Sequence, residues 1–283
     1  EFTLPYSALL AAMTSSYVDK RILGQARKDE RRSLAFFGGF LSENRNSSFL
    51  QTLAGIGYDV EPEPYRPSDA ETFDEEMFIK EMAEFCRRGG FPIVCGSTPR
   101  TAAGFTAFSK AIDSAGLIWI SPYASITSTY SGSEQLGQLL EALAEEDIRQ
   151  QEDGPGYLSP GADNLVIVGL QQAEQKEIEL IRRLGIAAFT MEDIDQSGIQ
   201  GVMRHALQRA VVGSRGLYVH FDERLSDGGQ EGLTNRETHL MMELLARTGF
   251  VRALDVSGNS AEGRRGRMLQ NFVASAMGKR ILG

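Results

Sequence analysis

The sequence contains few of the residues that most often bind metals or act as nucleophiles. Among 283 residues there are two cysteines and three histidines. The cysteines, Cys86 and Cys95, are too few for a disulfide framework or a cysteine-ligated zinc site, and they favour a reducing, intracellular setting. There is no His-x-His, HExxH, GxSxG or GxGxxG motif and no Walker loop. The common signatures of zinc hydrolases, serine hydrolases and nucleotide-binding proteins are therefore missing.

The sequence also lacks long apolar runs and an excess of positive charge. No apolar run approaches the roughly 20 residues that span a bilayer. The opening residues EFTLPYSALLAAM lack the charged and apolar regions of a signal peptide. The formal net charge is −9, which argues against general nucleic-acid binding. We therefore expect a soluble intracellular protein that binds neither membranes nor nucleic acids.

Short apolar runs alternate with segments of helical periodicity, which is typical of βαβ units and a parallel sheet. Helices are expected from Ser131 to Leu143 and over 199–210, 234–247 and 267–279. With no internal repeat and no linker, the sequence predicts one α/β domain over residues 1–283. The eight expected strands cover 34–37, 58–61, 92–95, 117–120, 165–169, 186–190, 217–221 and 251–256.

The expected strand at 117–120 ends in the sequence SPYAS, residues 121–125. In an open α/β sheet the carboxyl ends of the strands form the crevice where ligands bind. Small or neutral residues stand at this strand end, so it offers no charged group for binding or catalysis. Four further segments fall at the same edge: CGSTPR (95–100), SGSEQ (131–135), HFDERLSD (220–227) and GLTNRE (232–237).

Taken together, these segments resemble the ureohydrolases, the arginase and agmatinase family. That family carries a Gly-Gly-Asp-His-Ser loop, an Asp-Ala-His-x-Asp loop, a Ser-Phe-Asp-x-Asp segment and a Gly-Leu-Thr-x-Arg-Glu segment. Here they read, in the same order, CGSTP, SPYAS, HFDER and GLTNRE. The resemblance runs from about residue 92 to residue 283. It implies a three-layer α/β/α fold with a central parallel sheet of about eight strands, and a homo-oligomer, either a trimer or a dimer of trimers.

The resemblance also implies a binuclear manganese cluster, but only Asp222 remains at the six matching ligand positions. Hard divalent ions require several carboxylate or imidazole donors. A guanidinium about 4 Å from a dication costs roughly 8 kcal/mol at an effective dielectric constant of ~20. We therefore expect no manganese and no other cofactor, and an ion pair of Arg224 with Asp222 or Asp227. The five substituted positions are Thr98, Ser121, Tyr123, Ser125 and Arg224.

The matching positions on the substrate side are altered as well. Gln135 stands where the family has a substrate-proximal histidine, and an amide cannot shuttle a proton near pH 7. Glu237 matches the carboxylate that pairs with the substrate guanidinium in arginases. It also fits an acid favoured by the dipole at a helix N-terminus. His220, where the family usually has serine, is interpreted as a packing residue. We therefore assign no catalytic residue.

Three functional hypotheses follow. The first is a metal-free arginase-like pseudoenzyme without arginase activity, whose role is ligand sensing, partner binding or structural. The second is an enzyme with metal-independent chemistry on a cationic guanidino or amino substrate, using Cys95, or Asp222 with Glu237. The third is an anion-binding module that uses Arg100, Arg224 and helix N-termini. Cysteines exposed at an interface would in addition allow oxidation to link subunits.

Overall fold

The computed structural model describes residues 31–38, 48–62, 73–96, 98–112, 114–124, 164–226, 232–258 and 263–279. The helix expected to begin at Ser131 lies outside these residues. So do Ser125, Gln135 and Asp227, three residues singled out from the sequence.

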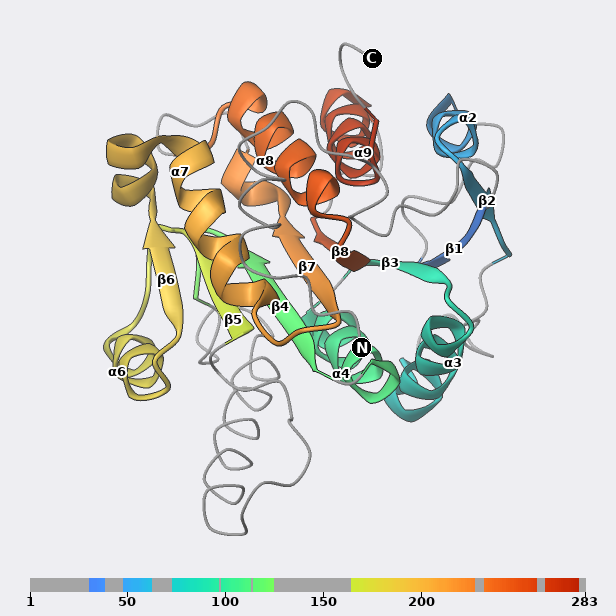
Figure 1. The fold of residues 1–283 in the computed structure, drawn as a ribbon, viewed down its shortest axis with the longest axis horizontal. Helices are drawn as coiled ribbons and strands as arrows, with labels where there is room; N and C mark the ends of the chain where they lie inside the picture. The colour runs from blue at the N-terminus through green and yellow to red at the C-terminus, as the bar shows by residue number, and fades with distance from the viewer. Residues whose placement is uncertain are drawn as a thin grey trace, which may run out of the picture.

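Eight parallel strands form one sheet in the order β2-β1-β3-β8-β7-β4-β5-β6 (Figure 1). All eight expected strands are confirmed. Each of the central strands β3, β4 and β7 is buried along its whole length, which explains why these strands read as unbroken apolar runs. The strands are β1 (Arg32–Phe37), β2 (Tyr58–Val60), β3 (Phe91–Cys95), β4 (Ala115–Ile120), β5 (Leu165–Leu170), β6 (Ala187–Thr190), β7 (Gly216–Asp222) and β8 (Val251–Ser257).

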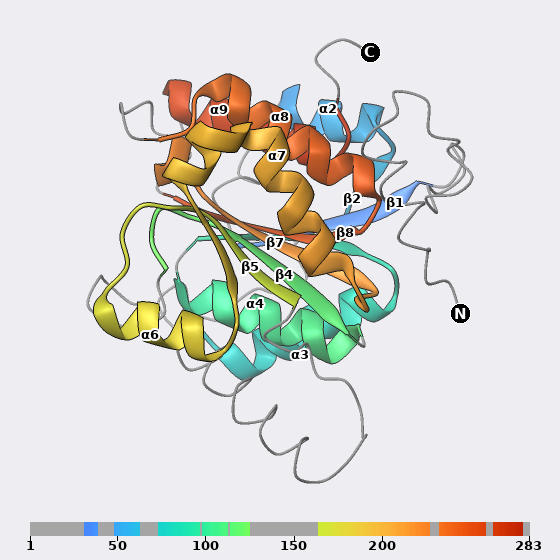
Figure 2. The ribbon, with the colours of Figure 1, turned by 60° about the vertical axis from the view of Figure 1, so that its left-hand side comes forward.

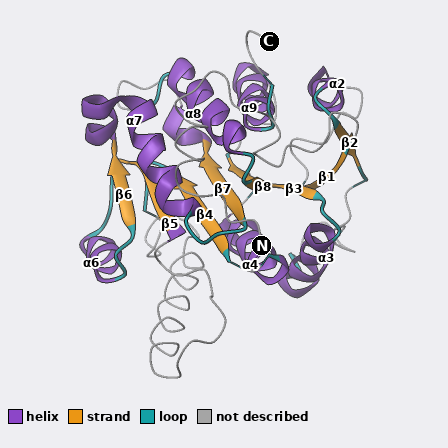
Figure 3. Cartoon of the chain, viewed as in Figure 1, coloured by secondary structure: helices purple, strands orange, loops and turns teal. Residues whose placement is uncertain are grey.

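Helices cover both faces of the sheet and complete three layers (Figures 2 and 3). One face carries α2 (Ser48–Gly55), α7 (Met191–Val211), α8 (Asn235–Thr248) and α9 (Gly263–Ala276). The other face carries α3 (Glu75–Arg87), α4 (Thr98–Ala111) and α6 (Gln175–Arg183). The predicted three-layer α/β/α fold with an eight-stranded parallel sheet is confirmed. No helix among the described residues is both long enough and apolar enough to cross a membrane.

The three expected helices that fall on described residues agree with the observed ones except at their ends. The segment 199–210 lies within α7, directly after a kink at Gly198, whose φ is 70°. Thr234 caps α8, and Gly249 ends it in the left-handed conformation with φ 67°, a conformation that glycine adopts without steric cost. The last helix begins at Gly263 rather than at residue 267 and ends at Ala276 rather than at residue 279.

The parallel arrangement brings the ends of several strands to one edge of the sheet. Ser121 follows β4, and Asp222 ends β7, which is paired with β4. On the other side of β8, Gly38 follows β1 and Gly96 follows β3. Residues that follow the strands therefore gather at two places along this edge, one at β4 and β7 and one at β1 and β3.

Candidate functional site

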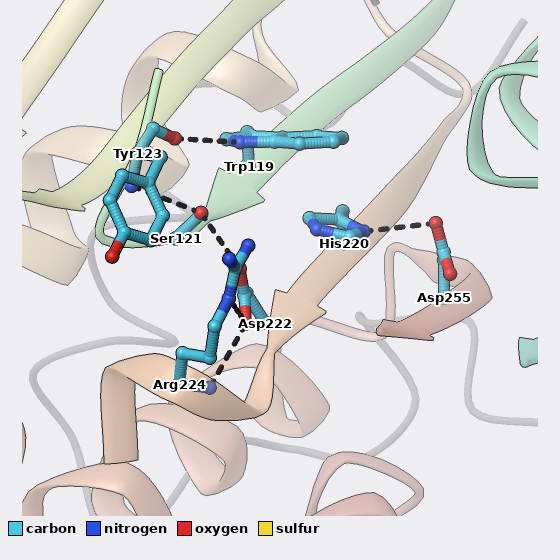
Figure 4. Close-up of polar contacts among 7 residues, drawn as sticks. All are labelled: Trp119, Ser121, Tyr123, His220, Asp222, Arg224 and Asp255. Carbon is cyan, nitrogen blue, oxygen red and sulfur yellow. Dashed lines mark hydrogen bonds and ion pairs between the residues drawn. The ribbon is translucent and has the colours of Figure 1, made fainter. Parts of the chain in front are cut away.

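The end of β4 is held by hydrogen bonds within the turn and to β7. The buried Ser121 hydroxyl donates to Oδ2 of Asp222 at 3.2 Å and accepts the backbone N–H of Tyr123 at 3.2 Å. The indole N–H of Trp119 donates to the carbonyl oxygen of Tyr123 at 3.3 Å (Figure 4). Ser121 and Tyr123 therefore have defined positions beside β7.

Asp222 is bound by Arg224, two residues further along the chain. Nε of Arg224 lies 3.0 Å from each carboxylate oxygen, and Nη2 lies 2.6 Å from Oδ2. The backbone N–H of Arg224 also donates to Oδ1 at 3.0 Å. The Asp222 side chain is 3% exposed and that of Arg224 is 55% exposed, so a guanidinium at the surface covers a buried carboxylate. The expected pairing of these two residues is confirmed.

Tyr123 holds the guanidinium from a second side. Cζ of Arg224 lies 4.6 Å from the centre of the Tyr123 ring, within the range of a cation–π contact. The hydrogen bonds to Asp222 raise the pKa of Arg224, against the opposing effect of burial. The cation therefore lies between a carboxylate and an aromatic ring, and the carboxylate favours its charged form.

The described residues of this site do not fit a binuclear manganese cluster. Both oxygens of Asp222 already accept hydrogen bonds from Arg224, and Oδ2 accepts a further one from Ser121. Ser121 and Tyr123 bring neutral hydroxyls to positions where hard cations favour charged oxygen or imidazole donors. Among the described residues, no group of three or more His, Cys, Asp or Glu side chains is arranged to hold a metal ion. Thr98 lies in the first turn of α4.

A buried histidine–aspartate pair lies beside this site, with the histidine two residues before Asp222 on β7. Nδ1 of His220 is 2.9 Å from Oδ2 of Asp255 on β8, and both side chains are almost fully buried. The imidazole stacks on Trp119 with ring centres 3.6 Å apart and planes inclined by 17°. His220 is therefore a packing residue, as interpreted, but its acidic partner was missed. Asp255 is an acid at a fully buried position of β8, and a buried acid requires a partner.

Tyr218 is a further buried polar residue, two positions before His220 on β7. Burial, followed by the charge of Asp255, raises the pKa of Tyr218 well above its ordinary value. The Tyr218 hydroxyl lies 3.5 Å from the carbonyl oxygen of Thr101 on α4. The other carboxylate oxygen of Asp255, Oδ1, has no hydrogen-bond partner among the described residues. Tyr218, His220 and Asp255 thus form a buried polar cluster on β7 and β8.

Glu237 takes part in capping helix α8. Its Oε2 accepts the backbone N–H and the hydroxyl of Thr234 at 2.9 and 2.7 Å, and its own N–H donates to the Thr234 hydroxyl at 3.3 Å. This reciprocal arrangement is a capping box, which stabilises the first turn of a helix. Of the two interpretations of Glu237, the helix N-terminal acid is the one with contacts in the structure.

Neither cysteine is an exposed thiol. Cys95 is fully buried at the end of β3, and Cys86 is buried in α3. Burial raises the pKa of Cys86 to about 12, and a thiol in that state is a poor nucleophile. Oxidation between subunits would require a cysteine exposed at an interface, and both side chains are buried.

The fold and the position of the site define an open, parallel α/β protein with its candidate site at the carboxyl ends of β4 and β7. The model of the Arginase family matches residues 56–262. This chain therefore belongs to the arginase family.

Individual relatives agree with this assignment. An arginase from Brevibacillus brevis is 27% identical over 221 residues, which cover 74% of this chain and 73% of that protein. Arginase-2, mitochondrial, from Rattus norvegicus is 33% identical over 160 residues, covering 50% and 44% of the two chains.

Solved structures support the fold. An arginase from Bacillus subtilis superposes with a TM-score of 0.71 at 19% identity, covering 89% of this chain and all of that one. The formimidoylglutamase from Bacillus subtilis superposes with a TM-score of 0.66 at 14% identity, covering 93% and 94% of the two chains. The same three-layer architecture thus occurs in proteins named for two different activities.

Proposed function

We propose that this chain is a non-catalytic member of the arginase family, which holds no binuclear manganese cluster and does not hydrolyse guanidino substrates. The observation that carries the proposal is the guanidinium of Arg224 on the buried carboxylate of Asp222. A metal ion would have to displace this cation from the one acidic ligand position that remains.

The chemistry of hydrolysis points the same way. A bound divalent ion lowers the pKa of water and supplies a hydroxide nucleophile near neutral pH. Without that ion the described site offers only the Ser121 hydroxyl, which is buried and hydrogen-bonded to Asp222, and the Tyr123 phenol. The carboxylate beside the Ser121 hydroxyl, Asp222, already accepts hydrogen bonds from Arg224 through both oxygens, so it is poorly placed to take a proton from that hydroxyl and activate it. The proposed role is therefore to bind a ligand or a partner, or to serve as a structural subunit.

Two competing functions have less support at this site. A cationic substrate would have to compete with Arg224 for Asp222. At Glu237 it would meet a carboxylate whose Oε2 already accepts the backbone N–H and the hydroxyl of Thr234. An anion at Arg224 would have to replace a carboxylate that holds the guanidinium through both oxygens. A ligand of either sign would thus have to compete with the contacts between Asp222 and Arg224.

The test is a manganese titration of the purified full chain, with metal content measured after dialysis, combined with assays of arginine, agmatine and formimidoylglutamate hydrolysis. We expect less than one equivalent of manganese and no turnover. Close to two equivalents of tightly bound manganese in the unmodified chain, or metal-dependent turnover, would overturn the proposal.

A variant that restores ligands serves as the matched comparison. It combines the substitutions Thr98→His, Ser121→Asp, Tyr123→His, Ser125→Asp and Arg224→Asp. If substitution of the ligands is the cause of the missing metal site, this variant binds manganese more tightly than the unmodified chain. A variant that folds but gains no affinity would show that the backbone of the crevice differs as well.

A further inference from the structure

A second arginine, Arg100, lies near the carboxyl edge of the sheet. It belongs to the first turn of α4, directly after β3, and is partly buried. Among the residues that the structure describes, it makes no ion pair and no hydrogen bond. Its Cζ lies 5.8 Å from the centre of the Phe73 ring. A partly desolvated charge without a counter-ion is unfavourable, so an anion at this position would be stabilising.

Two glycines give the Arg100 guanidinium its position. Gly38 follows β1 with φ 111°, and Gly96 follows β3 with φ 123°. A Cβ atom on Gly96 would lie 2.9 Å from Nη1 of Arg100, and one on Gly38 would lie 3.3 Å from the same atom. Both glycines adopt a backbone conformation that side chains disfavour. The guanidinium therefore lies across the ends of two neighbouring strands, at positions where Gly38 and Gly96 themselves carry no side chain.

The position of Arg100 in the topology is one where ligands bind. Strands β1 and β3 are neighbours in the sheet. Helix α2, which follows β1, packs on one face, and helix α4, which follows β3, packs on the other. Such a divergence of connections is a topological switch point, and ligands of open α/β sheets bind in the crevice outside the strand ends there. The first turn of α4 carries no acidic residue, so its dipole is left to favour an anion.

We propose that Arg100, lying over the ends of β1 and β3, binds a small oxyanion: the phosphate or carboxylate group of a small molecule. The planar guanidinium presents parallel N–H donors that match two oxygens of such a group. This site differs from Arg224, whose donors are already directed at Asp222. The proposal does not depend on whether the chain binds manganese.

The experiment is calorimetric titration of the full chain with inorganic phosphate and, separately, with acetate, at an ionic strength held constant with sodium chloride. We expect saturable binding of at least one of the two, which identifies the preferred group. Arg100→Gln should weaken that binding at least about tenfold, because a charge-assisted hydrogen bond is lost.

Arg88→Gln is the matched control. Arg88 also lies over a phenylalanine ring, with Cζ 5.6 Å from the centre of Phe85. It caps the end of α3 before β3 begins, so it stands away from the carboxyl ends of the strands. This variant should bind the anion as the unmodified chain does.

Three results would overturn the proposal: no saturable binding of either anion, equal binding by Arg100→Gln, or equal losses in both variants. Should Arg100→Gln fail to fold, the side-chain Nε–H resonance of Arg100 in the unmodified chain decides. That resonance is assigned with the Arg100→Lys variant. It should move on addition of the anion, and a resonance that stays in place contradicts the site.

Discussion

The side chain of Arg224 illustrates how one residue can change the character of a strand end. Its guanidinium is half-exposed, yet it satisfies a carboxylate that is almost completely buried. An exposed ion pair contributes little to stability, whereas a buried carboxylate left without donors costs several times more. Arg224 therefore stabilises the protein mainly because its removal would leave the buried Asp222 carboxylate with too few hydrogen-bond donors.

Arg224→Ala should lower the free energy of unfolding by about 2 kcal/mol, because Asp222 would keep only its bond from Ser121 and the backbone N–H at position 224. Urea denaturation measures this difference. Arg247→Ala is the control, since Arg247 pairs with Glu243 on the surface of α8 at 3.4 Å, and we expect a loss of less than about 0.5 kcal/mol there. Equal losses in the two variants would show that the buried carboxylate does not depend on Arg224.

Among the elements, the contact between α8 and α9 contains a histidine that responds to pH. Nδ1 of His239 on α8 lies 3.0 Å from Oγ of Ser275 on α9, and its ring packs edge-on against Phe272 at 4.8 Å. Burial lowers the pKa of His239, Glu243 opposes this change, and Lys279 adds to it. The folded protein therefore binds a proton at His239 less readily than the unfolded chain does.

The contribution of His239 to stability should be complete above its ordinary pKa of 6.5 and should be lost as the pH falls below that value. His239→Gln should reduce the slope of unfolding free energy against pH between about pH 7 and pH 5. Denaturation at a series of pH values measures the slope. His205→Gln, which alters an exposed histidine on α7, is the comparison. An unchanged slope in His239→Gln would contradict the assignment.

The elements were largely predictable from the sequence, and the contacts between them were not. The strands could be located because buried parallel strands read as apolar runs, as LIWI does in β4. The first turn of α9 was missed because Gly263, Arg264 and Arg265 carry no apolar periodicity. Helix α8 could be located because Leu240, Met241, Leu244 and Leu245 hold helical spacing.

In the candidate site, a contact could be predicted only where its two residues lie close together along the chain. The pairing of Arg224 with Asp222 could be predicted because the two residues are two positions apart. The contact of Tyr123 with Arg224 and the pair of His220 with Asp255 could not. Both depend on β7 lying between β4 and β8, an order that local sequence patterns do not determine. Asp255 did carry a signal, because a charged residue within a buried strand requires a partner.

For the whole molecule, the burial of both cysteines determines its response to oxidation. Cys86 and Cys95 should not react with a thiol reagent in the native protein at about pH 8, and both should react in denaturant. Absorbance titration with an aromatic disulfide reagent counts the reacting thiols, and a non-reducing gel after mild oxidation should show no linked subunits. One rapidly reacting equivalent in the native protein would show that one of these side chains becomes accessible.

Arg224 and Asp222 are two residues apart, so the counter-charge of the buried carboxylate comes from the chain itself. A site closed by a bound metal makes folding dependent on the supply of that metal, because the ion contributes free energy only once it is bound. Here the counter-charge of the buried carboxylate is part of the same strand end, two residues further along the chain. The end of β7 therefore carries both charges of the pair once it forms. If the site holds no manganese, as we propose, chelators and changes in divalent metal concentration should leave the stability of the chain unaltered.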